Sequence, residues 1–207
     1  MTGAPRDPAL LLATRNPKKL AELLRILEAS RVDVALADLS GYPDMPEVVE
    51  TGTTFEENAL LKARATVEYT GLPAVAEDSG LCVDALNGMP GVLSARWSGG
   101  HGDDDANLQL VLAQLTDVPS KRRGAHFEAA ATLVLPSGAE HTTEGSIFGT
   151  ITSEPRGSNG FGYDPIFLPD GYRITTAEMS EQDKDAISHR GRALRHLAPI
   201  IAARLGG

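Results

Sequence analysis

Short apolar runs alternate along the chain with segments in which apolar residues recur every three or four positions, and this pattern predicts an α/β fold. The first run, residues 9–13, is short and unbroken like a buried strand, and leucines at helical spacing follow it directly. Asn16 is a favourable N-cap and Pro17 suits the first helical position. Residues 14–19 are therefore expected to form a turn from strand to helix.

Two further helices are predicted in the middle of the chain. Thr54 and Glu57 form a capping box at the start of one helix, and Gly71 ends it. The other helix covers residues 103–115, where apolar residues line one face and aspartates occupy the positive end.

The remaining patterns predict strands and a last helix. Residues 74–76 form a short strand that is expected to enter a polar turn at residues 77–80, and an apolar run resumes over residues 81–86. Apolar side chains alternate over residues 127–135, and the turn chemistry of residues 136–138 predicts a hairpin. The last helix carries apolar residues at helical spacing, which are Leu194, Leu197, Ile201 and Leu205.

Composition narrows the class of protein. The chain has 207 residues, 42% of them hydrophobic, and a formal net charge of −9, so one domain over residues 1–207 is expected and duplex nucleic acid is not an expected partner. Residues 1–8 lack the basic and apolar regions of a signal peptide, and no apolar run approaches the roughly 20 residues of a membrane span. The single cysteine, Cys82, is expected to be a buried, inert thiol in a reducing compartment. We therefore expect a cytoplasmic protein without a membrane partner.

The start of the first predicted helix is a candidate phosphate site. A helix N-terminus leaves backbone N–H groups free and carries a partial positive charge. The residues gathered there are Thr14, Arg15, Asn16, Pro17, Lys18 and Lys19. The segment is not a Walker A loop, and a solvated first turn with surface lysines is the alternative interpretation.

Two adjacent carboxylates, Glu77 and Asp78, form a second candidate. Ligand sites in α/β sheets gather at strand ends, and Mg²⁺ prefers carboxylates together with phosphate oxygens of the substrate. Neighbours in an extended chain point in opposite directions, so Glu77 and Asp78 are not expected to face one site. A polar turn without chemistry is the alternative.

A third candidate lies on the second predicted helix. Asn58 and Lys62 are four residues apart and share one helix face, and Glu47 and Glu50 lie just upstream. The lysine suits phosphate and a glutamate suits a metal ion, whereas a solvated helix face is the alternative.

Residues 160–165 form a glycine-rich loop that is the fourth candidate. Phe161 and Tyr163 are expected to be an exposed aromatic pair that stacks on a base, and Asp164 can accept a hydrogen bond from a base N–H. The alternative is a turn whose rings pack into the core. Further groups suited to purine edges or phosphate follow at Lys184, His189 and Arg190.

The sequence predicts no zinc site. The other histidines are scattered, form neither an H-x-x-x-H nor an H-x-H pattern, and are His101, His126, His141 and His196. A single cysteine offers no cysteine-based metal knuckle. A serine nucleophile with a histidine and an aspartate is not apparent either.

Together these segments resemble the inosine triphosphate pyrophosphatase family, from about residue 10 to residue 197. The matching stretches are residues 13–19, 51–59, 62–63, 77–81, 90–91, 94–96, 160–165 and 188–190. The resemblance implies an elongated, two-lobed α/β fold with a long central mixed sheet flanked by helices and an active-site cleft between the lobes. It also implies a homodimer and Mg²⁺-dependent hydrolysis of damaged purine nucleoside triphosphates, such as ITP, dITP and XTP, to the monophosphate and pyrophosphate.

The resemblance implies residue roles by position. Asp78 would deprotonate the attacking water and touch Mg²⁺, Glu50 is favoured over Glu47 as the metal-side glutamate, and Lys19 and Lys62 would act with Asp78 in catalysis. The implied triphosphate contacts are Thr14, Arg15, Asn16, Pro17, Lys18 and Lys19, and Ser79 would lie in a turn that contacts the substrate. The implied nucleoside contacts are Phe161, Gly162, Tyr163 and Asp164, with Lys184, His189 and Arg190 on the side of the base. Arg15 stands where glycine is common in the family.

Two other functions stay open from the sequence. A Maf-like nucleotide pyrophosphatase of related fold would act on pyrimidine or modified nucleotides. A nucleotide-binding module without chemistry would keep the Lys19 and Phe161 regions but would not need Asp78.

Overall fold

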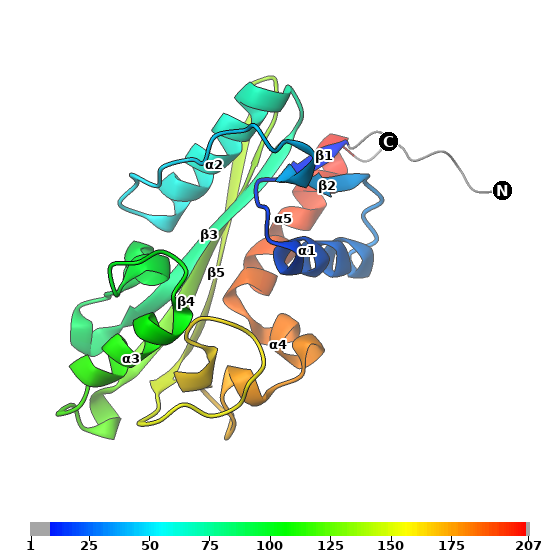
Figure 1. Cartoon of the computed structure of the whole chain (residues 1–207). Helices are drawn as coiled ribbons and strands as arrows, with labels where there is room; N and C mark the ends of the chain where they lie inside the picture. Colours follow the sequence, from blue (N-terminus) through cyan, green and yellow to red (C-terminus); the bar gives the residue numbers. More distant parts are fainter. Residues whose placement is uncertain (1–8, 206–207) are drawn as a thin grey trace. The chain divides into compact units, whose positions relative to one another are not determined.

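The computed structural model describes residues 9–205, apart from the side chain of Lys18, and these residues contain a six-stranded sheet (Figure 1). The strands are β1 (Leu10–Leu12), β2 (Leu36–Asp38), β3 (Ala74–Val83), β4 (Gly124–Val134), β5 (Glu140–Ile151) and β6 (Phe167–Pro169), and their order in the sheet is β2-β1-β3-β4-β5-β6. β1 pairs in parallel with β2 and β3, whereas β5 and β6 are antiparallel. The sheet is therefore mixed, and the predicted α/β class is confirmed.

The helices begin and end close to the residues that the capping signals predict. They are α1 (Pro17–Ala29), α2 (Phe55–Thr70), α3 (Asp104–Gln114), α4 (Glu181–Ile187) and α5 (His189–Leu205). Thr54 Oγ1 accepts a hydrogen bond from Glu57 N at 3.1 Å, and Gly71 closes α2 with a left-handed φ of 72°. Within residues 9–205, none of these helices combines the length and the hydrophobicity that crossing a membrane requires.

The predicted turn at residues 77–80 is wrong, because β3 runs unbroken from Ala74 to Val83. A Glu-Asp-Ser-Gly segment usually favours a solvated turn. Here the strand lies between β1 and β4, and the carboxylates of Glu77 and Asp78 are buried with cationic partners. Pairing with a cation offsets the cost of burying each carboxylate, so the strand continues through four polar or small residues.

Three short elements carry too little pattern to be predicted. β2 and β6 have three residues each, which is too short for a period of two to show. α4 has seven residues and starts at the cap Ser180, whose side chain accepts from Asp183 N. Lys184 therefore lies inside a short helix that precedes α5.

The chain divides into two compact units. Unit 1 consists of Met1–Asp78, Ala130–Glu144 and Arg190–Gly207, and unit 2 of Ser79–Ala129 and Gly145–His189. In unit 1, small residues of α2, β3 and β4 pack together at Ala63, Ala76 and Val134. In unit 2, Val83, Leu108 and Phe127 belong to a larger apolar core. The expectation of one domain over residues 1–207 stays a prediction.

The register between β1 and β3 shows where Glu77 and Asp78 lie relative to the end of β1. Leu12, the last residue of β1, is the partner of Val75, and the chain then turns into α1. β3 continues past this point, so Glu77 and Asp78 lie just beyond the carboxyl end of β1. Ligands of α/β sheets commonly bind at this end of parallel strands.

Candidate active site

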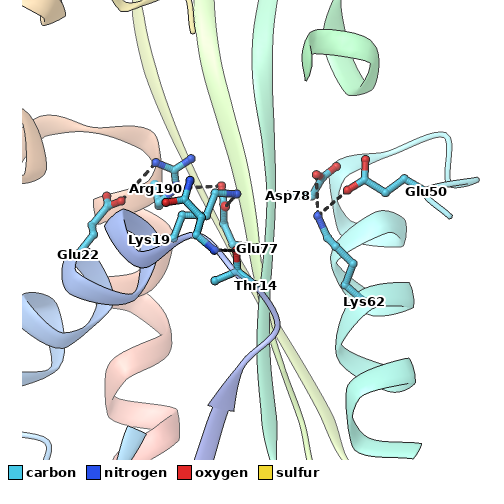
Figure 2. A network of polar contacts seen from close by, with 9 residues as sticks. Thr14, Lys19, Glu22, Glu50, Lys62, Glu77, Asp78 and Arg190 are labelled. Carbon is cyan, nitrogen blue, oxygen red and sulfur yellow. Dashed lines mark hydrogen bonds and ion pairs between the residues drawn. The ribbon is translucent and has the colours of Figure 1, made fainter. Parts of the chain in front are cut away.

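Two polar networks lie on opposite sides of β3 in unit 1 (Figure 2). They are connected through the adjacent residues Glu77 and Asp78, whose side chains point to opposite faces because β3 is extended. This confirms the prediction that the two carboxylates do not face one site.

The Glu77 network joins α1, β3 and α5. Lys19 Nζ lies 2.9 Å from Glu77 Oε2, and Arg190 Nε lies 3.1 Å from Glu77 Oε1. The same guanidinium reaches Glu22 through Nη1 at 3.2 Å. Burial alone would lower the pKa of Arg190, but the charges of Glu77 and Glu22 outweigh it and raise that pKa. Glu77 thus pairs with Lys19 and Arg190, and Arg190 also pairs with Glu22.

Arg190 and Glu22 differ from what the sequence indicates. Arg190 was expected near the base, yet only 5% of it is exposed, and its guanidinium bridges two carboxylates. Glu22 was not singled out. A usable signal was its position three residues after Lys19, which puts both on one face of α1.

The turn before α1 keeps the form expected of a phosphate-binding helix start. Thr14 Oγ1 accepts from Asn16 N at 3.1 Å, and the helix begins at Pro17. Asn16 and Pro17 are exposed, and Lys19 keeps 28% of its side chain exposed while it pairs with Glu77. The side chain of Lys18 lies outside the described part of the chain.

Arg15 points to a backbone loop. Its Nη2 donates to the carbonyl of Met45 at 2.7 Å and to that of Tyr42 at 3.3 Å. These bonds tie the start of α1 to the segment that leads toward Glu50. The cation that replaces the family's common glycine is thus engaged by protein carbonyls rather than left free for phosphate.

The Asp78 network joins β3, α2 and the segment before α2. Lys62 Nζ lies 2.9 Å from both Asp78 Oδ1 and Glu50 Oε1, and Asn58 Nδ2 donates to Asp78 Oδ2 at 3.2 Å. Glu47, the other candidate glutamate, is exposed. The structure thus brings Glu50 to Asp78, as the sequence analysis favoured.

Lys62 links the two carboxylates of the Asp78 network. Asp78 and Glu50 both form ion pairs with its ammonium group. Burial raises the pKa of Asp78, and the attraction of Lys62 only partly opposes this. Burial alone would lower the pKa of Lys62, but the charges of Asp78 and Glu50 raise it. Two carboxylates that meet at one lysine offer the oxygen ligands that a hard divalent cation prefers.

Gly52 allows the segment before α2 to approach this network closely. Its N–H donates to Asn58 Oδ1 at 2.8 Å, and a Cβ at Gly52 would lie 2.7 Å from the same oxygen. Asn58 is fully buried, with its amide oxygen bound to Gly52 and its amide nitrogen bound to Asp78. Asn58 therefore orients one oxygen of Asp78.

In unit 2, Asp164 organises the glycine-rich loop. Its Oδ2 accepts from Phe161 N at 2.9 Å and forms an ion pair with Lys184, and its Oδ1 accepts from Thr176 Oγ1 at 2.8 Å. A Cβ at Gly160 would lie 2.2 Å from Oδ2, so the loop requires glycine there. Asp164 was expected to accept from a base, but it is 4% exposed and both of its oxygens hold the loop.

The expected exposed aromatic pair is wrong for one of its members. Tyr163 is 4% exposed and its hydroxyl donates to Ser94 O at 2.8 Å, whereas Phe161 is 40% exposed. Lys184 Nζ lies 4.9 Å from the centroid of the Phe161 ring. Packing into the core and the partner for its hydroxyl explain why Tyr163 turns inward. Phe161 with Lys184 is the aromatic and cationic surface that the loop presents.

The other predicted contacts of unit 2 occupy different environments. Gly162 N donates to Asp104 Oδ2 at 2.8 Å, which ties the loop to the first turn of α3. His189 is 8% exposed and stacks on Phe127, with ring centroids 4.8 Å apart and an interplanar angle of 9°. Ser79 follows Asp78 in β3 and is half-buried.

The mixed sheet, a lysine at an exposed helix start and an acid-rich cluster beside it define an α/β protein of the phosphate-handling type. The chain matches the model of the Ham1 family over residues 10–200. It therefore belongs to the Ham1 family.

Known relatives share most of their length with this chain. A protein of Streptomyces avermitilis named dITP/XTP pyrophosphatase is 56% identical over 197 residues, which cover 95% of this chain and 98% of the relative. A crystal structure of a Mycobacterium abscessus protein, described as a nucleoside-triphosphatase and dITP/XTP pyrophosphatase, is 60% identical, with a TM-score of 0.76 and coverage of 93% and 98%. The structure of a HAM1 protein from Coxiella burnetii is 40% identical, with a TM-score of 0.85 and coverage of 94% and 98%.

Proposed function

We propose that this chain is a nucleoside-triphosphate pyrophosphatase that hydrolyses damaged purine nucleotides, such as dITP, XTP and ITP, to the monophosphate and pyrophosphate. The observation that carries the proposal is the buried Asp78 carboxylate, held by Asn58 and by Lys62, which also pairs with Glu50. Two relatives, 56% and 60% identical to this chain, are named dITP/XTP pyrophosphatases, and they suggest the substrate class.

Asp78 is the proposed base for the attacking water. Water adds to the α-phosphorus, the bond from that phosphorus to the bridging oxygen breaks, and pyrophosphate leaves with the electron pair. The proton of the water passes to Asp78. Such a reaction needs positioning and charge neutralisation more than a protein nucleophile. Asn58 and Lys62 keep the carboxylate oriented through one oxygen each.

Mg²⁺ is the proposed cofactor, and the donors fit it. Asp78 and Glu50 provide hard oxygen ligands and lie close enough to share Lys62 at 2.9 Å each. A bound Mg²⁺ would neutralise phosphate charge and favour loss of pyrophosphate. With Mg²⁺ bound to the carboxylates, Lys62 would remain beside them and could bind a phosphate oxygen of the substrate.

The start of α1 is the proposed polyphosphate-binding element. Its first-turn N–H groups and the half-exposed Lys19 offer positive charge at one end of the helix. Glu77 holds Lys19 in place by an ion pair, and Arg190 pairs with the same carboxylate. Lys19 can exchange its bond to Glu77 for a phosphate oxygen without leaving the network, because Arg190 still neutralises Glu77.

The loop of unit 2 is proposed to contact the purine. Phe161 offers a partly exposed ring for stacking, and Lys184 offers N–H donors beside it. A donor that meets the six-keto oxygen of inosine or xanthosine would face another donor in adenine, which leaves a polar group unpaired. We further propose that the protein is a homodimer, which light scattering can measure.

A substrate panel tests the proposal. Pyrophosphate release is measured from ITP, dITP, XTP, GTP and ATP, with Mg²⁺ and after chelation of divalent ions. We expect Mg²⁺-dependent release from ITP, dITP and XTP in preference to GTP and ATP. Preference for pyrimidine or modified nucleotides would indicate the Maf-like alternative, and nucleotide binding without release would indicate a binding module.

A further inference from the structure

One face of the strands in unit 2 carries three metal-ligating side chains from two strands. Val83 of β3 and Phe127 of β4 point into the apolar core of unit 2. Because side chains alternate along a strand, Cys82 on β3 and His126 and Glu128 on β4 belong to the opposite face. None of the three takes part in the proposed hydrolysis.

The ligand atoms of these residues converge. One ligand atom from each of Cys82, His126 and Glu128 lies within 4.8 Å of the other two, and His126 Nε2 is 3.7 Å from Glu128 Oε2. Zinc bonds of about 2.0–2.3 Å in a tetrahedron put neighbouring ligands about 3.3–3.8 Å apart. The imidazole and the carboxylate already stand at such a spacing, and an adjustment of about 1 Å suffices for the sulfur.

Burial within the cluster leaves one side open. Cys82 is 8% exposed, whereas the side chains of His126 and Glu128 are 26% and 39% exposed. The imidazole lies against the ring of Phe148, with centroids 5.3 Å apart, and this contact restricts its rotation. A metal ion can therefore enter from solvent and keep water in its fourth position, as at zinc sites with three protein ligands.

The local charge favours a cation. Burial and, to a smaller extent, the negative charges of Glu128 and Asp84 together raise the pKa of the Cys82 thiol to about 11. The same carboxylates attract a divalent ion. On coordination the thiol releases its proton to solvent and binds as a thiolate.

We propose that Cys82, His126 and Glu128 form a binding site for a divalent transition metal of the zinc type. Sulfur, imidazole nitrogen and carboxylate oxygen together suit Zn²⁺ or Co²⁺, whereas Mg²⁺ selects oxygen ligands. The site differs in ligand chemistry from the oxygen cluster of Asp78 and Glu50, and it stands whether or not the proposed hydrolysis is correct.

Co²⁺ titration of the full-length, metal-stripped protein tests the site. Excess Mg²⁺ is kept present so that oxygen-ligand sites are filled. We expect one Co²⁺ per chain, with the charge-transfer absorption of a thiolate–cobalt bond, and displacement by Zn²⁺. Cys82→Ser should abolish this absorption, and His126→Gln and Glu128→Gln should each weaken binding at least about tenfold.

Matched controls make the result specific. His101→Gln changes an exposed histidine of the same unit, and Asp78→Asn changes the oxygen cluster; both should keep the absorption. Circular dichroism checks that each variant is folded. Absence of the thiolate absorption in the wild-type protein, or its survival at full affinity in both His126→Gln and Glu128→Gln, would overturn the proposal.

Discussion

On the Glu77 side of β3 two carboxylates meet two cations, whereas on the Asp78 side two carboxylates share one lysine. The first network holds α1 and α5 to the strand. In the second, two carboxylates converge on one ammonium, and this pair of oxygen donors suits a divalent cation. Adjacent residues of one strand thus separate a mainly structural ion network from the proposed reactive one, and substitutions on the two sides should have different consequences.

The largest expected effect is the loss of turnover in Asp78→Asn. The amide keeps the size of the side chain but cannot accept the proton of water, so kcat should fall by about 10²–10⁴-fold. Lys62 keeps Glu50 as a partner, so the free energy of unfolding should change little. Steady-state pyrophosphate release and binding of a non-hydrolysable nucleotide measure the two properties. Asp44→Asn, at an exposed position of the same unit, is the control, and wild-type turnover in Asp78→Asn would refute the role.

Glu77→Gln should act mainly on stability. The side chain of Glu77 is 4% exposed, and the substitution removes a charged partner from the buried guanidinium of Arg190. Breaking one partner of a buried ion network costs about 3–5 kcal/mol in free energy of unfolding. Urea denaturation measures this loss, with Glu68→Gln at an exposed helix position as the control. If Glu77→Gln were as stable as wild type, the structural interpretation of this network would be wrong.

The sequence predicted the helices better than the strand that carries the site. Caps are local signals, so Thr54 and Gly71 located α2 to within a residue. Glu77 and Asp78 were wrongly predicted to lie in a turn, because both side chains are polar, whereas they belong to β3. The cations that allow them to remain in a strand come from α1, α2 and α5, far away in the sequence. The pattern of neighbouring residues in the sequence contains no information on such distant partners.

The sequence predicted well the candidate residues that pair with each other. It predicted less well those whose side chains can bind either a ligand or another group of the protein. Glu50 and Lys62 meet Asp78 as expected. Arg15, Tyr163 and Asp164 fit a ligand by type, but in the structure they bind backbone groups or neighbouring side chains. The cluster around Cys82 went unnoticed because its ligands lie on two strands, and only the H-x-E spacing of β4 is visible locally.

Gly52→Ala tests whether close packing positions the Asp78 network. The added methyl would lie 2.7 Å from Asn58 Oδ1, so Asn58 must move and loosen its bond to Asp78. We expect a loss of about 1–3 kcal/mol in the free energy of unfolding and a lower kcat. Gly41→Ala is the matched control because nothing lies within 4 Å of a Cβ there. Equal behaviour of the two variants would show that Gly52 does not position the network.

The smallest expected effect concerns an exposed carboxylate next to the same segment. Glu57 accepts from Thr53 N at 2.6 Å and from Thr53 Oγ1 at 2.9 Å, and these bonds lower its pKa. A carboxyl whose pKa is lower in the folded state stabilises the protein above its ordinary pKa, and this contribution is lost as the pH falls through the lowered value.

Glu57→Gln should therefore lower the Tm slightly at neutral pH and not at all once the wild-type carboxyl is protonated. Glu56→Gln, at the neighbouring exposed position of α2, controls for the change in net charge. Thermal unfolding of both variants across acidic and neutral pH measures the difference. A constant difference between Glu57→Gln and wild type at every pH would mean that packing, rather than the charge of Glu57, secures the segment beside Asp78.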